Sequence, residues 1–374
     1  MENNKIRISM LGGSGSGKTS FFSGIIHSMI VNAKIVGKGA DRSSISLNAK
    51  SIKQSNSYFL EEEDSEGLVR SMNNAALLSK YLISDDPDVP NGGFGVSTTD
   101  SIEFTFDLLI NNIPCCEIVI ADYAGELIDD PSNKAMKSNL VQLCTNIAES
   151  DAIIIMSDSV IISRHLNNNF SIQKETGAQM INMIFPNIKT ATRKNNRPLT
   201  TLVAMTKTDS PRIPDMMRKS NFANISSTLF DSIYSKTFAS MDMNSDSWGI
   251  IPVSAIGRGN VDDDNYIIEN ANIQPENIDT AIIFSISSSI SKILADKEKN
   301  IKSLEEELKK IFGFTAKVRT AKENIRKQIS ELTTQKQALE QCRNAISQMN
   351  DIFPQTINNM HCPNITEIGE VVKK

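Results

Sequence analysis

A run of glycine and serine near the start of the chain ends in a lysine and a threonine. It reads Gly12-Gly13-Ser14-Gly15-Ser16-Gly17-Lys18-Thr19, in the pattern G-x-x-x-x-G-K-T. Glycines let a backbone fold closely around an anion, and the N–H groups of the loop and of a following helix would point at it. Lys18 would neutralise the β- and γ-phosphates of a nucleotide, and the Thr19 hydroxyl would ligate Mg²⁺. The run therefore predicts a phosphate-binding loop.

The flanking residues agree with this prediction. An apolar strand-like segment, residues 6–11, precedes the loop, and a helix-like series beginning at Phe21 and Phe22 follows it. This is the context that a phosphate-binding loop requires. A flexible Gly/Ser turn would not explain a Lys-Thr pair at the start of the helix. A dinucleotide-binding fingerprint fits poorly, because Lys18 stands where its third Gly or Ala belongs.

A second motif, Asp122-Tyr123-Ala124-Gly125-Glu126, directly follows the apolar segment 115–121. An Asp at the end of a strand beside the phosphate loop can reach Mg²⁺ through a water molecule. A Gly three residues later can donate its backbone N–H to a γ-phosphate. The alternative is an ordinary strand-end Asp in a turn.

Two further motifs follow the apolar segments 199–205 and 248–251. In Thr206-Lys207-Thr208-Asp209 the carboxylate can accept from both N1–H and the exocyclic amine of guanine, and the lysine stem can lie on the base. In Pro252-Val253-Ser254-Ala255 a backbone N–H can bind the guanine O6. Taken alone, the first is equally consistent with a polar loop, and the second is nearly uninformative.

In this order the four motifs resemble the translation-factor-type (TRAFAC) class of P-loop GTPases, over about residues 5–290. The long insertion at 36–96 and the form D-Y-A-G-E are more similar to the bacterial double-GTPase-like families than to small signalling GTPases. The resemblance implies a GTP-binding, GTP-hydrolysing molecular switch with GTP/GDP and Mg²⁺ as its ligands.

The resemblance also implies a role for each matching residue. The phosphates would be held by Gly13, Ser14, Gly15, Ser16, Gly17, Lys18, Thr19 and Ser20, and guanine by Thr206, Lys207, Asp209, Ser254 and Ala255. Thr19 would bind Mg²⁺ directly, Asp122 would bind it through water, and Gly125 would sense the γ-phosphate. The switch threonine, which would bind Mg²⁺ and act in catalysis, would be Thr98 or Thr99, with Thr98 preferred, unless these residues only cap a strand.

The chain departs from the pattern at Glu126, where many small GTPases have the Gln that orients the attacking water. A carboxylate can position water but repels the γ-phosphate, so slow or partner-dependent hydrolysis is expected. Arg42 and Arg70 are candidates for an arginine finger within the chain. The alternatives are a GTP-binding scaffold without turnover and an ATP-using P-loop protein. A membrane-remodelling GTPase of dynamin type is disfavoured, because the helical arm is short and shows no evident apolar or basic tip.

The elements that must position these residues alternate along the chain. Strands are expected at 5–11, 101–110, 115–121, 151–157, 199–205 and 248–254, and helices at 18–35, 132–149, 172–188, 217–240 and 276–294. Such alternation predicts an α/β fold of the P-loop NTPase type, with a mostly parallel sheet covered by helices on both faces. Only four residues, 111–114, separate two of the strands, so these two must form one antiparallel hairpin.

The predicted domains are a GTPase domain over 1–290, a helical hairpin or coiled coil over 291–352 and an irregular tail over 353–374. Apolar residues at helical spacing predict two helices that turn at Gly313. Lys336 and Arg343 interrupt the apolar seam of the second helix, so it is expected to pair weakly or to pack against something else. Part of the insertion, residues 58–83, also has helical spacing.

Composition limits the remaining classes. The chain has 374 residues and a net charge of −5, so nothing global favours nucleic-acid binding. Its five cysteines contain no C-x-x-C pair, which fits a reducing cytoplasm. No uninterrupted apolar run reaches about 18 residues, so no membrane-spanning helix is expected. The expected partners are a guanine nucleotide and a protein partner or second copy bound through the C-terminal helices.

Overall fold

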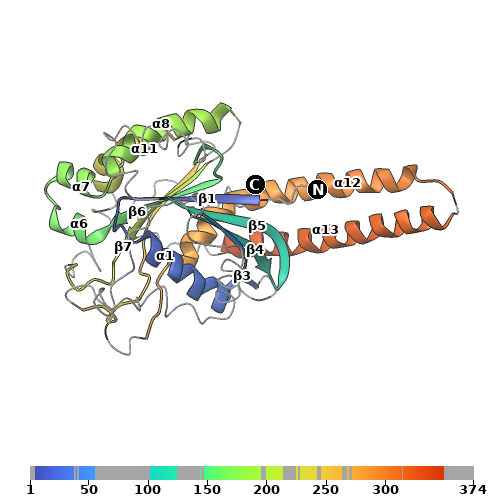
Figure 1. Ribbon diagram of the computed structural model, residues 1–374, viewed down its shortest axis with the longest axis horizontal. Helices are drawn as coiled ribbons and strands as arrows, with labels where there is room; N and C mark the ends of the chain where they lie inside the picture. The colour runs from blue at the N-terminus through green and yellow to red at the C-terminus, as the bar shows by residue number, and fades with distance from the viewer. Residues whose placement is uncertain are drawn as a thin grey trace.

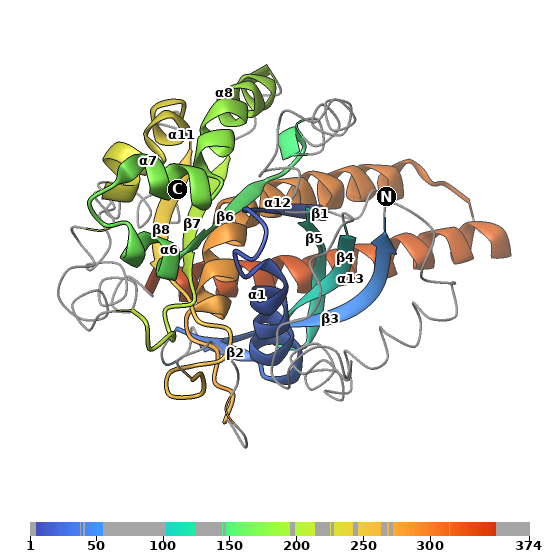
Figure 2. The ribbon, with the colours of Figure 1, turned by 60° about the vertical axis from the view of Figure 1, so that its left-hand side comes forward.

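Eight strands form one sheet in the part of the chain that the computed structural model describes, namely residues 5–37, 39, 42–54, 102–123, 144, 147–194, 199–213, 225, 228–241, 246–262, 268, 272–313 and 315–348. Their order is β2-β3-β4-β5-β1-β6-β7-β8 (Figure 1 and, with all eight strands labelled, Figure 2). The strands are β1 (Lys5–Leu11), β2 (Lys34–Val36), β3 (Ser43–Gln54), β4 (Ile102–Ile110), β5 (Ile113–Asp122), β6 (Ala152–Asp158), β7 (Thr200–Thr206) and β8 (Ser247–Pro252).

The centre of the sheet is parallel, as predicted. Strand β1 pairs in parallel with β5 and β6, and β6–β7 and β7–β8 are also parallel pairs. All residues of β6 and β7 are buried, which is typical of central strands covered by helices on both faces. The carboxyl ends of β1, β5, β6, β7 and β8 therefore meet at one edge of the sheet, where the predicted site residues follow the strands.

The predicted β4–β5 hairpin is confirmed. Its turn places Asn111 and Asn112 at φ 52° and 63°, the left-handed backbone that a two-residue hairpin turn needs. The hairpin is not the only antiparallel part, however. Strand β3 pairs antiparallel with β4, and β2 pairs antiparallel with β3, so the sequence-based expectation of a single antiparallel hairpin was too low.

The two extra strands are β2, which begins where the predicted helix 18–35 was expected to end, and β3, which lies in the predicted insertion 36–96. The predicted helix 18–35 ends early, because α1 (Lys18–Ile25) continues as a π-helical turn η1 (Ile26–Val31) and the chain then enters β2. Strand β3 buries Ile45, Leu47 and Ala49 at alternate positions. Serine, asparagine and lysine between them weakened its apolar pattern. The helical segment expected at 58–83 lies outside the described residues.

Helices cover both faces of the sheet. On one face lie α7 (Asn169–Glu175), α8 (Ala178–Lys194) and α11 (Ser235–Ala239), with α6 (Ser159–Arg164) and η3 (Leu229–Ile233) nearby (Figure 1). The predicted helix 172–188 is two helices, separated at Gly177 with φ 75°. On the other face α1 packs beside the first half of α12 (Ile278–Lys310) (Figure 2). The helix expected at 132–149 and most of that at 217–240 lie outside the described residues.

Helix α12 has two parts with different surroundings. Its first half is a core helix that begins against α1, where a Cβ on Gly24 would lie 2.2 Å from Ile278 Cδ1, so a larger residue at position 24 would require this buried side chain to move. Its second half leaves the body and pairs with α13 (Ala316–Gln348) as a projecting hairpin (Figure 1). The hairpin turning at Gly313, with φ 120°, is confirmed. A coiled coil in the strict sense stays a prediction.

The carboxyl-terminal part of α13 packs against the body. This agrees with the expectation that a helix whose apolar seam is interrupted would pack against something besides its partner helix. Leu339, Cys342 and Ile346 are buried there, and α13 contacts β5, β3 and β4. The predicted domain boundary at 290–291 falls inside the continuous helix α12. The base of the hairpin is thus packed onto the sheet, and only its distal part projects.

One described helix, α12, is long and apolar enough to span a membrane by length and composition. Of its apolar window, however, 67% is buried inside the protein. The core helix of a folded body passes the same test, so packing against the sheet accounts for its composition.

Candidate nucleotide-binding site

The phosphate loop joins β1 to α1, and its glycines meet specific steric demands. A Cβ on Gly12 would lie 2.5 Å from Ser16 Oγ and 2.9 Å from the carbonyl oxygen of Met156 on β6. Gly15 and Gly17 have φ of 69° and 91°, which side chains rarely adopt. The predicted strand–loop–helix arrangement is thus present, and the loop residues are those that the sequence indicated.

Lys18 lies inside this loop. The residue is only 6% exposed, and its Nζ donates to the carbonyl oxygens of Gly12, at 2.8 Å, and Gly13, at 3.0 Å. The ammonium is therefore held within the concave side of the loop, where phosphate oxygens would replace the carbonyl groups as its partners. Ser14 and Gly15 are exposed at the loop's crest, and the side chain of Thr19 is outside the described part.

Asp122 stands beside the phosphate loop. It ends β5, and its position pairs with Met10 on β1, two residues before the loop. The residue is 4% exposed, and its Oδ1 has no hydrogen-bond partner among the described residues. Burial raises the pKa of this carboxyl to about 6, although the positive charge of Lys18 works in the opposite direction.

A buried carboxylate oxygen without a partner is costly, and a divalent cation or its bound water would satisfy it. The position and the unsatisfied oxygen of Asp122 thus fit a magnesium ion bound between β5 and the start of α1. Carboxylate and hydroxyl oxygens are ligands that Mg²⁺ prefers.

Several predicted site residues lie outside the described part of the chain. These are the switch threonine candidates Thr98 and Thr99, and Gly125 and Glu126 after β5. Arg70 is also outside it.

Arg42 is described, and its position argues against an arginine finger. It directly precedes β3. The start of β3 pairs with the end of β4, and the chain turns there into the start of β5. Asp122 lies at the opposite end of β5, so about nine strand residues, or about 30 Å at ~3.3 Å per residue, separate the two positions. The expectation for Arg42 was therefore wrong.

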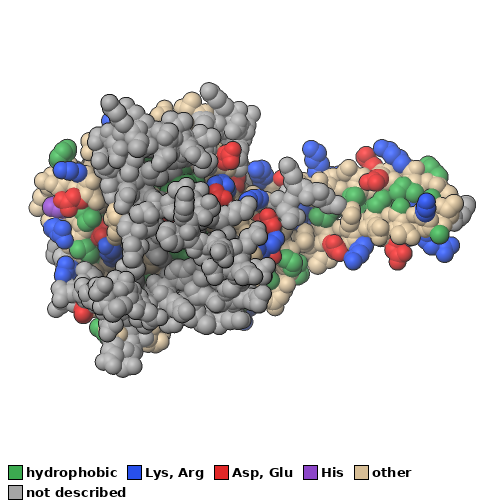
Figure 3. All heavy atoms as spheres, in the orientation of Figure 1, with side chains coloured by type: hydrophobic (Ala, Val, Ile, Leu, Met, Phe, Trp, Pro, Cys, Tyr) green, Lys and Arg blue, Asp and Glu red, His purple; other side chains and the backbone are tan. Residues whose placement is uncertain are grey.

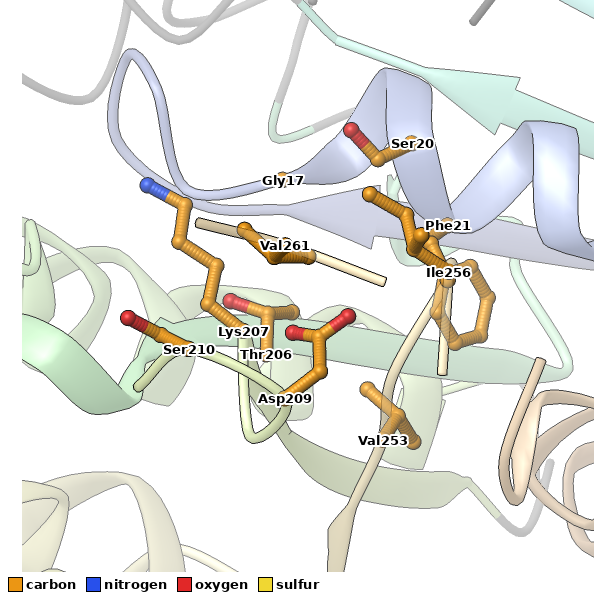
Figure 4. Close-up of a pocket in the computed structure, with 11 residues that line it drawn as sticks. Gly17, Ser20, Phe21, Thr206, Lys207, Asp209, Ser210, Val253, Ile256 and Val261 are labelled. Atoms are coloured by element: carbon orange, nitrogen blue, oxygen red, sulfur yellow. The ribbon is translucent and has the colours of Figure 1, made fainter. Parts of the chain in front are cut away.

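A pocket opens between the phosphate loop and the carboxyl ends of β7 and β8 (Figure 4). It contains about 590 Å³ of empty space, part of it open to solvent. Both later sequence motifs contribute to its wall, although they are far apart in the chain. The lining residues are Gly17, Ser20, Phe21, Thr206, Lys207, Asp209, Ser210, Val253, Ala255, Ile256 and Val261.

Asp209 is fixed at the base of this pocket by Ser254. The Ser254 Oγ donates to Asp209 Oδ2 at 2.6 Å and itself accepts from the N–H of Gly257 at 2.7 Å. Asp209 is 7% exposed, and burial raises its pKa, against which the hydrogen bond from Ser254 acts. Figure 4 shows its carboxylate directed into the pocket.

The role expected for Ser254 needs a correction. Its own N–H donates to the carbonyl oxygen of Glu276 at 3.1 Å and is not available for a base oxygen. Ser254 therefore acts through its side chain, by orienting Asp209. Ala255 lines the pocket, and its N–H makes no hydrogen bond among the residues described, so this group is the available donor.

Thr206 and Lys207 connect the pocket to neighbouring elements. Thr206 Oγ1 donates to the carbonyl oxygen of Ser16 at 2.6 Å and so joins the end of β7 to the phosphate loop. Lys207 has a left-handed φ of 57°, and its Nζ contacts Asp158 Oδ2 at 2.6 Å. This ion pair stretches the lysine stem along the pocket wall (Figure 4).

Asp158 is a site residue that the sequence analysis missed. Its Oδ1 also accepts from the N–H of Val160 at 2.8 Å, so it caps α6 while its other oxygen holds Lys207. An Asp directly after a buried strand and before an apolar run is the signal that could have indicated it. The apolar wall formed by Phe21, Ile256 and Val261 was also missed, since these residues read as core.

The sequence matches no protein family and no curated protein. Among solved structures, the fold is similar to a chain of the "Signal recognition particle receptor SRb-GTP/SRX complex from Chaetomium thermophilum". The two share 12% identity over 68% of this chain and 94% of that chain, with a TM-score of 0.34. A likeness at this level carries no functional assignment, which therefore depends on the geometry of the site.

Proposed function

We propose that this protein binds GTP and GDP with Mg²⁺. The observation that carries the proposal is the position of Asp209 in a pocket that opens onto the phosphate loop. A carboxylate there can accept from both N1–H and the exocyclic amine of guanine, whereas adenine lacks this pair of donors. The Lys207 stem would lie along one side of the base, and the Ala255 N–H would donate to the guanine O6.

The phosphates would lie in the loop from Gly13 to Ser20. Lys18, already held within the loop, would exchange its two carbonyl partners for β- and γ-phosphate oxygens. Thr19 and Asp122 would hold Mg²⁺, directly and through water respectively. When bound, the ion would neutralise phosphate charge, and the unsatisfied Asp122 oxygen supports its placement.

Slow hydrolysis of GTP to GDP and phosphate completes the proposal, in a cytoplasmic protein. Thr98, Gly125 and Glu126 would contact the γ-phosphate side, and Glu126 in place of Gln would limit the rate. Two alternatives keep part of the site: a GTP-binding scaffold without turnover, and an ATP-using P-loop protein. The hydrogen-bonded Asp209–Ser254 pair favours guanine over adenine, and a single-turnover assay separates a switch from a scaffold.

The structure also supports a route from this site to the helical arm. Asp122 ends the β4–β5 hairpin at the nucleotide edge of the sheet, and the hairpin's turn lies at the opposite edge. There Asn111 Nδ2 donates to Gln341 Oε1 of α13 at 3.0 Å, and Gln335 Nε2 of α13 donates to the Pro114 carbonyl at 2.9 Å. A shift of the hairpin on nucleotide exchange would therefore reach α13, as a switch that signals through its arm requires.

The proposal is tested by binding of fluorescent GTP, GDP and ATP analogues with Mg²⁺. Wild type should prefer guanine nucleotides, and Asp209→Asn should lose that preference. Asp231→Asn is the matched control, because this aspartate is exposed on η3 and does not line the pocket. Equal binding of ATP and GTP by wild type, unchanged in Asp209→Asn, would replace the guanine assignment with an ATP-dependent one.

A further inference from the structure

The tip of the helical hairpin exposes a large apolar side chain. Phe312, in the turn between α12 and α13, is 84% exposed, more than any other large apolar side chain in the described residues. The seam between the two helices is filled without it, since Leu308, Ile311 and Val318 are half-buried there. Phe312 thus contributes little to holding the hairpin together.

Positive charge surrounds this side chain. Residues 308–322 contain five cationic residues and no carboxylate, namely Lys309, Lys310, Lys317, Arg319 and Lys322. None of the five forms an ion pair with any residue that the structure describes. Figure 3 shows Lys and Arg side chains around the end of the arm. The nearest carboxylates in sequence are Glu307 on α12 and Glu323 on α13.

The placement of two of these cations is unfavourable for the helix that carries them. The first turn of α13 has no acidic residue, and Lys317 and Arg319 stand near its N-terminus, where the helix dipole favours negative charge. The stability of α13 therefore does not explain why Lys317 and Arg319 stand at this end. A negatively charged surface bound at the tip would explain their position.

We propose that the arm tip docks on an anionic lipid surface, with Phe312 inserted at the headgroup level and the five cations around it. An exposed aromatic side chain flanked by cations is the pattern of an interfacial anchor, in which lysine and arginine stems reach toward lipid phosphates. The arm carries the tip away from the sheet, so the body does not block a flat surface (Figure 1). The exposure of Phe312 and the five cations beside it correct the sequence-based expectation of a tip without evident apolar or basic character.

A lipid surface fits these observations better than a protein partner. Between Glu307 and Glu323 the chain carries positive charge only, whereas a surface that recognises a protein partner usually mixes the two signs. Contact between the arm tip and a lipid surface does not depend on GTP binding at the nucleotide site. Nucleotide binding measured on the variants of the arm tip should equal that of wild type, so a failure of either proposal can be recognised independently of the other.

The test is sedimentation of the full chain with vesicles of phosphatidylcholine, with and without phosphatidylserine, at low and high salt. Binding is expected only with phosphatidylserine and is expected to weaken as salt rises. Phe312→Asp should weaken binding at least tenfold, since it removes the apolar anchor and adds a negative charge. Lys309→Gln with Lys310→Gln should weaken it about 30-fold, given about 1 kcal/mol for each cation.

Phe170→Asp is the matched control. This phenylalanine is 67% exposed on α7, far along the chain from the arm, so its replacement should leave vesicle binding unchanged. Circular dichroism should show equal helix content in all variants, because each altered side chain is exposed. Equal binding to neutral vesicles, or none to anionic vesicles at low salt, would overturn the proposal. So would self-association in vesicle-free solution that Phe312→Asp abolishes, which would assign the tip to a second copy.

Discussion

Replacing Asp122 by Asn should stabilise the ligand-free protein while it removes magnesium-dependent nucleotide binding. The carboxyl is almost fully buried, one of its oxygens has no partner among the described residues, and its pKa is raised from 3.8 to about 6. A charge held there without a cation is a cost that the folded state bears for function. Asn keeps the shape of the side chain without the charge.

The sign of the pH effect follows from these values. Below pH 3.8 the carboxyl is protonated in both the folded and unfolded states and costs nothing. As pH rises toward 6 the unfolded chain ionises first, so the free energy of unfolding falls, and above about 6 the full cost is present. A difference of about two pH units, at about 1.4 kcal/mol each, sets an upper bound of about 3 kcal/mol.

The assay is urea denaturation of wild type and Asp122→Asn between pH 4 and pH 8, without nucleotide or Mg²⁺. The variant should be more stable at pH 8 by up to about 3 kcal/mol, with the gap closing toward pH 4. Asp231→Asn, at an exposed carboxylate, should show no such gap.

Saturating Mg²⁺ and GTP should reverse the order. A ligand at about 1,000 times its Kd stabilises the folded state by about 4.1 kcal/mol, which exceeds the gap of up to about 3 kcal/mol, and only wild type should gain this. A variant less stable than wild type at pH 8 without ligand, or one whose pH dependence equals that of wild type, would refute the account of Asp122 as an uncompensated magnesium ligand.

Three other substitutions test the remaining contacts of the site. Ser254→Ala should lower the preference for GTP over ATP about tenfold, because it removes a hydrogen bond to a charged group; competition binding measures this, and an unchanged ratio would contradict the orienting role. Asp158→Ala should lower the free energy of unfolding by about 1 kcal/mol, because the cap of α6 is lost, and should also lower nucleotide affinity. Asp158→Ser should restore the stability but not the affinity, because serine can cap the helix but cannot hold Lys207. Equal nucleotide affinity in wild type and both variants would show that Asp158 does not position Lys207 for binding. Gly12→Ala should destabilise the phosphate loop by about 1–3 kcal/mol through contact with Ser16 and Met156; calorimetry measures it, and a stability equal to wild type would show that the loop can shift.

Much of the site could be predicted from the sequence because its constraints are local. The phosphate loop depends on glycines at φ values that other residues avoid and on a lysine at the start of a helix, and both are visible in adjacent residues. The β4–β5 hairpin was equally accessible, since four intervening residues cannot make a parallel crossover. Asp122 and Asp209 were located because each belongs to a short motif at the carboxyl end of an apolar strand.

Tertiary structure decided the partners of these residues, which lie far away in the chain. Ser254 and Asp209 are 45 positions apart, Lys207 and Asp158 are 49 apart, and Asn111 and Gln341 are 230 apart. Strand β3 has a weak apolar pattern of its own and is a strand because β4 offers it an edge. Whether Phe312 is buried or exposed likewise depended on how α12 and α13 pair. The backbone conformation of a loop depends on its neighbouring residues and can be read from them. The burial of a side chain and the pairing of strands and helices depend on segments that are distant in the sequence.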